Sequence, residues 1–552
     1  MLSRCFRVRL DLLIALLVTL AALAVRIHNI QFNSLSEDEV AKWRAVQEYR
    51  HGHFSGVNSE HPMTLKALAW VSIEVGERYN RLASDRNLPT LRAEGWLRLP
   101  NVLLGAATTF VIYLLARRMM GSPGALAASF FWAFAPMPVA INRLAKEETP
   151  FVFFTLLACY FYFRAKQAQT GTTTRRFCDL SAIGFGLSFA SKYVPHLFGL
   201  NSLAWHLAGR AGLDRKPMVT KRFFFVIALT VVLANPVLLS PGNFSCVLDW
   251  LHNGGARHHG YDFNGTLYVN TPTQWFAGVP WYYYFWLLVV KTPVPILLAI
   301  LSGSILLLVH RDRLACYFFV SMALVQVLGL SISGGKWIRY SLWLLPFLYL
   351  AGGYAVQEAL IYMRRRGVYQ VAILAAAILI FSGSLFELCA WSPYYPLYLN
   401  SIGGGARNVA KYFGPDEVAE SDTRQVAELI CRTAPAHARL ATARPMSMTW
   451  YVEGCGRSDI QITPLYDRSY NPQNGDLIVL EPSRRYFETQ RFFDLFENSG
   501  IPRREIHIGP VLTSTVYAVP TTAVPDLRFS VADENSASVR PIVFRPEIRR
   551  TR

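Results

Sequence analysis

The sequence is short of acidic residues and of paired cysteines. Asp and Glu number 37 against 55 Lys and Arg, so the formal net charge is +18. No basic face with interleaved aromatic residues goes with that excess, so a nucleic-acid partner is not indicated. The eight cysteines form no CxxC pair, which removes support for zinc-finger and thioredoxin-type motifs. No small-x-small cleavage motif follows the first apolar stretch, and we interpret that stretch as a retained helix rather than a signal peptide.

Long apolar runs dominate the first 390 residues. Hydrophobic residues make up 52% of the 552-residue chain. Because one membrane crossing takes about 20 apolar residues, these runs predict an α-helical polytopic membrane protein with about eleven transmembrane helices. The fifth and sixth runs nearly touch, and Pro195 favours a break between them. The eleven predicted spans are 10–27, 98–116, 123–141, 150–164, 180–192, 194–209, 222–240, 282–309, 314–332, 341–360 and 368–389.

The basic residues indicate the orientation of these helices. With the N-terminus in the cytoplasm, all six loops on the inside are basic and nearly free of acid, which is the positive-inside pattern. The sequence therefore predicts an inner (plasma) membrane protein with a cytoplasmic N-terminus. These loops carry Arg4, Arg7, Arg9, Arg117, Arg118, Arg164, Lys166, Arg175, Arg176, Arg210, Arg215, Lys216, Lys221, Arg222, Arg311, Arg313, Arg364, Arg365 and Arg366.

The segments on the outside differ in character from the spans. Residues 28–97 form a long loop with helical patterning in "EVAKWRAVQEYRHG", and residues 241–281 form a second loop rich in His, Gly, Asn and Tyr. After residue 390 short β-type runs alternate with helical ones, which predicts a small α/β extracytoplasmic domain. We therefore expect a membrane domain over 1–390 and a second domain over 391–552, with little order after about 523. Cys431 and Cys455 lie in that second domain and can form a disulfide in an oxidising compartment.

Ionisable residues from five outer segments gather on the outside face. Such groups are costly near hydrocarbon, so functional or paired use is the first interpretation. A carboxylate base could take a proton from an acceptor there, while Lys and Arg hold a phosphate leaving group. The residues are Asp38, Glu39, Glu60, His61, Arg143, Lys146, Glu147, Glu148, Lys192, His196, Arg257, His258, His259, Asp262, Lys336, Arg339 and Tyr340.

Each of these signals also has a purely structural interpretation. The acids at 37–39 suit the dipole at a helix N-terminus, and a helix beginning near Pro150 explains one of Glu147 and Glu148. The pair His258-His259 is typical of a surface loop, although it leaves a divalent metal ion open. The cations at 336 and 339 suit an interfacial anchor beside an aromatic belt.

An ordered series of short motifs runs from the first outer loop to residue 400. Asp38-Glu39 match an acidic pair, His61-Pro62 match a His-Pro motif, and "NRLAKEETPFVFF" is similar to an Arg-x-x-x-x-Asp segment. Further segments are "ASKYVPH", "PWYYYFWLLVVKTPVP", "GGKWIRYSLWLLP" and "SPYYPLYLN". The series covers nearly the whole chain. It resembles the GT-C glycosyltransferases, specifically the bacterial, phospholipid carrier-dependent branch of the protein O-mannosyltransferase family (glycosyltransferase family 39).

The resemblance implies an enzyme that uses a polyprenyl-phosphate sugar on the outer face of the membrane. Asp38 would be the general base, with Glu39 and Glu148 as further catalytic residues, although the family often has Asp where this chain has Glu148. The residues expected to bind the donor phosphate are Lys336, Arg339, Arg143 and Lys192. The residues expected to bind substrate are Glu60, His61, His258, His259 and Tyr340.

Two other functions compete with an inverting glycosyltransferase. A transporter or flippase of a lipid-linked substrate would place its ionisable groups near the bilayer midplane, on broken helices in repeated halves, and no paired halves are evident. A scaffold that presents the C-terminal domain leaves the clustered charges unexplained. The motifs leave open the sugar and the acceptor, which can be a protein, a lipid or a glycan. The lack of a WWDxG-like run argues against oligosaccharyl transfer to Asn.

Overall fold

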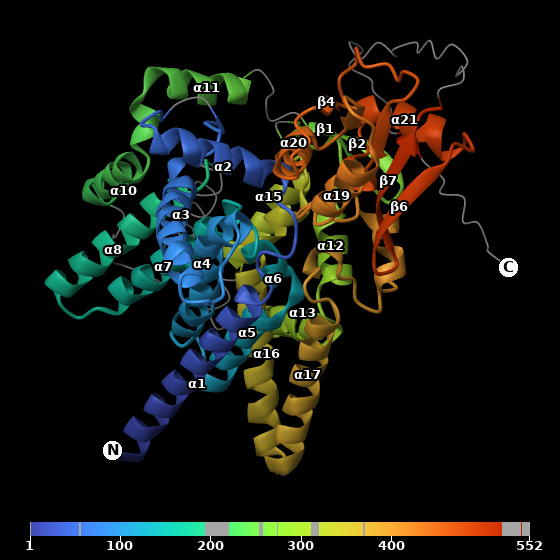
Figure 1. The fold of residues 1–552 in the computed structure, drawn as a ribbon. Helices are drawn as coiled ribbons and strands as arrows, with labels where there is room; N and C mark the ends of the chain where they lie inside the picture. Colours follow the sequence, from blue (N-terminus) through green and yellow to red (C-terminus); the bar gives the residue numbers. More distant parts are fainter. Residues whose placement is uncertain are drawn as a thin grey trace.

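A computed structural model describes residues 2–54, 57–193, 220–252, 258–272, 274–310, 320–367, 370–520 and 542–543. The described chain is mostly helical, with strands in the second outer segment and the C-terminal part (Figure 1). The predicted span 194–209 lies outside the described residues, as do the beginning of the span 314–332 and almost all of the tail after 523.

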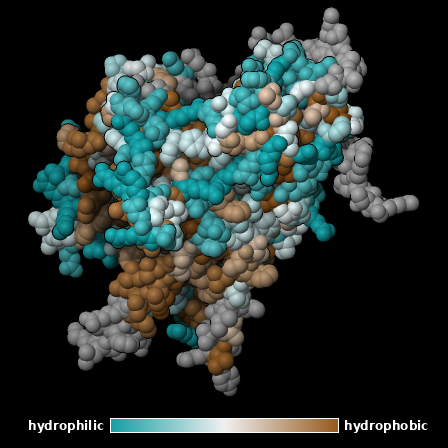
Figure 2. All heavy atoms as spheres, viewed as in Figure 1, coloured by the Kyte–Doolittle hydropathy of each residue, from teal (hydrophilic) through white to brown (hydrophobic). Residues whose placement is uncertain are grey.

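The helical body consists of helices that overlap the predicted spans, while the number of eleven spans stays a prediction. Among the described residues, two helices are long and apolar enough to cross a membrane, α1 over Leu10–Ile27 and α4, and a bent pair makes a third. Apolar residues gather over the lower helices in the view of Figure 2, and hydrophilic residues gather above them. The helices are α1 (Leu2–Ile27), α4 (Ala93–Ala116), α5 (Ser122–Phe134), α6 (Pro136–Asn142), α7 (Glu148–Gln167), α8 (Gly171–Phe189), α10 (Lys221–Ala234), α12 (Tyr283–Lys291), α13 (Val294–His310), α15 (Val325–Ile332), α16 (Leu345–Arg365) and α17 (Gln370–Ala390).

Two predicted spans are broken helices. The span 123–141 divides into α5 and α6, which meet at 56°. Pro136 begins α6, and the preceding Ala135 has the extended backbone that a following proline favours. The span 282–309 divides into α12 and α13 at Thr292, which is also extended and also precedes a proline. Proline chemistry therefore explains why continuous apolar runs form separate helices.

The first outer segment forms two helices, as its patterning predicts. Helix α2 (Glu37–Arg50) begins at a capping box, in which Ser36 and Glu39 satisfy each other's backbone N–H groups. Helix α3 (Met63–Ser84) begins directly after Pro62. The second outer segment contains α11 (Pro241–His252) and an antiparallel pair, β1 (His258–Phe263) and β2 (Thr266–Asn270), with β8 (Ile542–Val543) beside β2.

The C-terminal part is built around a five-stranded sheet in the order β4-β3-β5-β7-β6. Strands β3, β4 and β5 are parallel, while β7 is antiparallel to β5 and β6. The segment "PMSMTWYVEG" forms helix α20, and Pro445 occupies its first turn, where a proline is tolerated. The elements are α19 (Thr423–Thr433), β3 (Arg439–Thr442), α20 (Pro445–Gly454), β4 (Gln461–Pro464), β5 (Leu477–Leu480), α21 (Phe487–Glu497), β6 (Arg503–Ile508) and β7 (Val511–Ala518).

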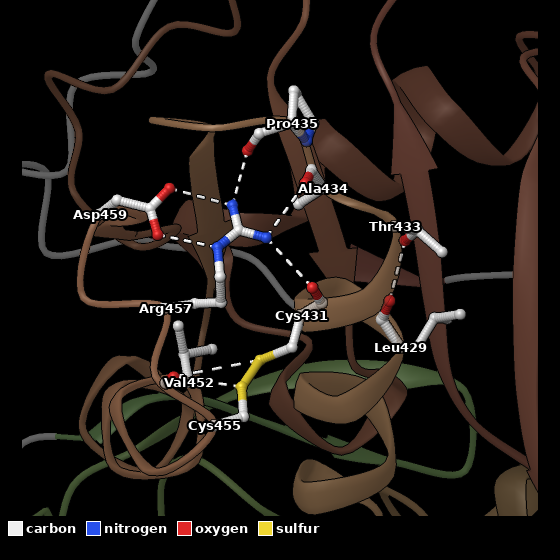
Figure 3. The surroundings of a disulfide bond; sticks show 9 residues. All are labelled: Leu429, Cys431, Thr433, Ala434, Pro435, Val452, Cys455, Arg457 and Asp459. Carbon is white, nitrogen blue, oxygen red and sulfur yellow. Dashed lines mark hydrogen bonds and ion pairs between the residues drawn. A yellow bond between two sulfur atoms is a disulfide. The ribbon is translucent and has the colours of Figure 1, made fainter.

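A disulfide joins Cys431 of α19 to Cys455 at the end of α20 (Figure 3). Beside it, Arg457 donates hydrogen bonds to the carbonyls of Cys431 and Ala434, both at 3.1 Å, and pairs with Asp459 at 2.8 Å. These carbonyls belong to the last turn of α19, where no intrahelical donor remains. The two helices are thus held together at their C-terminal ends.

Candidate active site

The site is built at the N-terminus of α2, where Glu39 fixes the helix in place. Both Glu39 carboxylate oxygens bind Arg98 of α4, each at 2.7 Å. The same carboxylate accepts hydrogen bonds from the backbone N–H of Ser36 at 3.0 Å and of Ala145 at 2.9 Å. Burial acts to raise the pKa of Glu39, but Arg98 and these N–H groups lower it to about 2. A fully paired carboxylate of this kind joins three segments and leaves no oxygen free for substrate.

Asp38, one residue earlier, is paired but still reachable from solvent. Its Oδ2 lies 2.5 Å from Lys146 Nζ and 3.1 Å from Arg339 Nη1. The Asp38 side chain remains 35% exposed, whereas Lys146 is 4% exposed. Burial acts to raise the pKa of Asp38, yet Lys146 and Arg339 hold it well below its ordinary value. Asp38 is therefore a carboxylate that is ionised at neutral pH and lies between two cations.

Glu147, at the start of α7, forms a second ion pair with Lys42 of α2. Its Oε1 lies 2.9 Å from Lys42 Nζ and 4.0 Å from His61 Nδ1. Burial opposes ionisation, but His61 and Lys42 together keep the pKa of Glu147 below its ordinary range. Lys42 is not among the predicted site residues, although it stands four residues after Asp38 on the same helix face, the spacing at which helical side chains meet.

Glu148 forms the third pair, at the first turn of α7. Its Oε1 contacts Lys192 Nζ at 2.5 Å and Arg339 Nε at 3.4 Å, so Arg339 bridges Asp38 and Glu148. Lys192 lies over the rings of Tyr340 at 4.5 Å and Trp343 at 5.4 Å. Glu148 Oε2 is buried and has no hydrogen-bond partner in the described part of the chain.

The three pairs form one continuous cluster drawn from four segments: α2, residues 146–148, the segment of Lys192 and the segment of Arg339. Four cations (Lys42, Lys146, Lys192 and Arg339) accompany three carboxylates (Asp38, Glu147 and Glu148). An excess of cations over acids beside a single partly exposed carboxylate suits an anionic ligand. Within the described ranges no group of three His, Cys, Asp or Glu side chains could hold a metal ion. The residues of the cluster therefore do not fit a divalent cation, because each carboxylate already has a cationic partner.

Arg143 and Lys336, both predicted to bind the donor phosphate, contact backbone carbonyls instead of the carboxylates of this cluster. Arg143 donates to the carbonyls of Arg26 at 3.1 Å and Asn29 at 2.9 Å, which places it at the end of α1. The Lys336 ammonium donates to the carbonyls of Ser331 and Ser333, and burial lowers its pKa to about 8.

The remaining predicted residues divide between the edge of the cluster and the C-terminal part. Glu60 accepts a hydrogen bond from Asn58 at 2.9 Å, and His61 lies next to Glu147. His259 lies 3.3 Å from Glu488 of α21 and stacks on Tyr466, and His258 precedes it in β1. Tyr340 is the aromatic residue that the cluster does contain.

Comparisons with known proteins show similarity in one sequence segment and in the fold. Residues 93–239 match the family described as dolichyl-phosphate-mannose-protein mannosyltransferase. The structure of ArnT from Cupriavidus metallidurans bound to undecaprenyl phosphate aligns over 91% of this chain and 97% of its own, with 14% identity and a TM-score of 0.51. The oligosaccharyltransferase of Archaeoglobus fulgidus aligns over 85% of this chain and 69% of its own, with 11% identity and a TM-score of 0.51. The chain therefore shares the fold of these two enzymes, and its residues 93–239 are similar to the mannosyltransferase family.

A curated relative from Bacillus subtilis, named "Putative mannosyltransferase YkcB", is 38% identical over 72 residues. That match spans 13% of this chain and 10% of the relative's length. The family match over 93–239 contains Arg98, Lys146, Glu147, Glu148 and Lys192, whereas Asp38 and Arg339 lie outside it. The fold therefore brings residues from outside the family match to those within it.

Proposed function

We propose that this GT-C protein is an inverting glycosyltransferase that moves a sugar from a polyprenyl-phosphate donor to an acceptor on the extracytoplasmic face of the membrane. Asp38 is the general base. One observation carries the proposal: among the carboxylates of the cluster, Asp38 alone combines substantial exposure, 35%, with direct contact to two cations. The undecaprenyl phosphate bound to the similarly folded ArnT is consistent with a donor of this class.

The reaction is a single displacement at the sugar's anomeric carbon. The acceptor's O–H or N–H bond breaks and its proton passes to the Asp38 carboxylate, while the acceptor atom forms the new bond to the anomeric carbon. The bond from that carbon to the phosphate oxygen breaks, and its electron pair leaves with the polyprenyl phosphate. Arg339 and Lys146 are the cations best placed to neutralise the charge that develops on the phosphate. Attack opposite the leaving group inverts the configuration.

Because Lys146 and Arg339 contact Asp38, binding of the donor phosphate would change the proton affinity of Asp38. In the structure described here Asp38 shares its charge with Lys146 and Arg339, which makes it a weak base. A donor phosphate that draws these cations toward itself leaves Asp38 less stabilised as an anion, so its proton affinity rises. Lys192 and Glu148 adjoin the same arginine and complete the charged wall of the site. The carbonyl contacts of Lys336 and Arg143 support a role for these two cations in holding the backbone around the site.

The extracytoplasmic location and the two-domain arrangement belong to the same proposal. The positive-inside pattern supports an outer location for the cluster. The Cys431–Cys455 disulfide fits an oxidising compartment, and it lies in the part of the chain assigned to the outside domain.

The test measures sugar transfer from a panel of polyprenyl-phosphate sugars by wild type and by Asp38→Asn. The substitution keeps the size of the side chain and removes the base, so we expect a loss of about 10²- to 10⁴-fold in kcat. Binding of undecaprenyl phosphate should remain within a few-fold of wild type. Glu77→Gln is the matched control, because Glu77 is 47% exposed and pairs only with Arg50 in the part of the chain described.

Three results are distinguishable. Transfer by wild type with loss in Asp38→Asn supports the proposal, and the active donor names the sugar. Equal transfer by both proteins contradicts the role of Asp38. Movement of the lipid across the bilayer with no transfer from any donor supports the transporter or flippase hypothesis instead.

A further inference from the structure

The segment Ser34–Glu37, immediately before Asp38, is held by the C-terminal part of the chain. Ser34 N–H donates to the carbonyl of Ser421 at 3.3 Å, and Leu35 N–H donates to the hydroxyl of Tyr451 at 2.7 Å. Glu37 N–H donates to Glu420 Oε2 at 2.9 Å. Three of four successive backbone N–H groups therefore find their acceptors more than 380 residues away, and the fourth, that of Ser36, belongs to the capping box.

Glu37 strengthens this attachment through its side chain. Its Oε1 accepts hydrogen bonds from the backbone N–H of Ser447 at 2.6 Å and from the Ser447 hydroxyl at 2.8 Å. Ser447 lies in the first turn of α20, where N–H groups are free and the helix dipole favours a carboxylate. Glu37 is 8% exposed and Ser447 is fully buried.

The first turn of α20 is itself fixed at the carboxyl ends of the parallel strands β3 and β5. Arg444, which follows β3, pairs with Asp422 at 2.6 Å and donates to Ser483 at 2.8 Å. Thr442 donates to Glu481, which follows β5, at 2.5 Å. Parallel sheets usually bind ligands at this edge. Here the polar side chains of the edge are buried. Helix α20, which begins at this edge, contacts α2. Figure 1 shows α20 beside the end of α2.

We infer that Ser447 and Glu37 are positioning residues for Asp38, and that the C-terminal part of the chain forms the frame that holds the base of the transferase. The inference rests on the proposed function of Asp38. A shift of the α2 N-terminus moves Asp38 relative to Lys146 and Arg339, and small displacements of a catalytic group are costly in rate. Lys146 and Arg339, the two cations proposed to neutralise the donor phosphate, belong to other segments than α2.

The experiment compares Ser447→Ala with Thr449→Ala. Thr449 lies two residues further along α20, and its hydroxyl bonds only to the carbonyl of Pro445 in the described chain, so it is a matched control. We expect Ser447→Ala to lower kcat about 10- to 100-fold with the KM for the donor within about two-fold, because transition-state alignment is lost while donor contacts remain. Ser447→Thr keeps the hydroxyl and should restore most of kcat.

Hydrogen exchange of the backbone amides of residues 34–37 gives a readout that does not depend on activity. Ser447→Ala should speed exchange there by about ten-fold, and Thr449→Ala should leave it unchanged, because protection reports local opening. Unchanged exchange and unchanged kcat in Ser447→Ala overturn the inference while leaving the proposed function intact. Loss of protection without any effect of Asp38→Asn on transfer means that the frame exists but the proposed base is wrong.

Discussion

At the scale of single residues, the ionisation of Asp38 gives the clearest prediction. Its pKa in the free protein lies well below the ordinary value, because Lys146 and Arg339 outweigh the effect of burial. The proposed base acts only when ionised, so kcat/KM, which reports the free enzyme, should stay level as the pH falls from about 8 to about 4. In the donor complex the phosphate competes for both cations, so the acid limb of kcat should lie at higher pH than that of kcat/KM. Coincident acid limbs in a full pH profile would argue against competition between phosphate and Asp38.

At the scale of helices and strands, the pair Glu39–Arg98 joins α2 to α4. Arg98→Met removes the cation and leaves a buried carboxylate unpaired, which typically costs about 3–5 kcal/mol. We expect a clear fall in the thermal unfolding midpoint. The pKa of Glu39 is lowered to about 2, so the stability that the pair contributes is present above the ordinary Glu pKa and is lost only as the pH falls toward 2.

The control for this pair is the double variant Arg98→Met with Glu39→Gln. It removes the unpaired charge and should recover part of the loss. An unfolding midpoint for Arg98→Met equal to that of wild type would show that water reaches Glu39 and that the joint between α2 and α4 is weak.

At the scale of the whole molecule, local patterns in the sequence predict the elements but not the partners across the fold. The helical periodicity of "EVAKWRAVQEYRHG" predicts α2, and the motifs indicate Asp38 and Arg339, which do meet. Arg98 begins a predicted apolar span, and nothing local shows that its partner is Glu39, 59 residues earlier.

The contacts of Lys336 and Arg143 could not be predicted from the sequence either. Their residue type suits a phosphate, but their charges lie against backbone carbonyls, because the ends of helices leave carbonyls without donors. Periodicity cannot reveal such contacts, since they depend on which helix ends lie nearby. Pro136 and Pro293, in contrast, are visible in the sequence, and the helix breaks beside them could have been predicted.

The bond from Ser34 to Ser421 has a consequence for biosynthesis. The two residues are 387 positions apart, so the segment before Asp38 finds its acceptors only after nearly all the helices have been made. During synthesis the first helices are made early, while the amides of Ser34, Leu35 and Glu37 still lack these acceptors. A nascent chain that has not yet released α20 therefore has the first helices but lacks the acceptors that hold the segment before Asp38. Under the proposed function, the site is completed only when the last-made part of the chain docks on the first-made part.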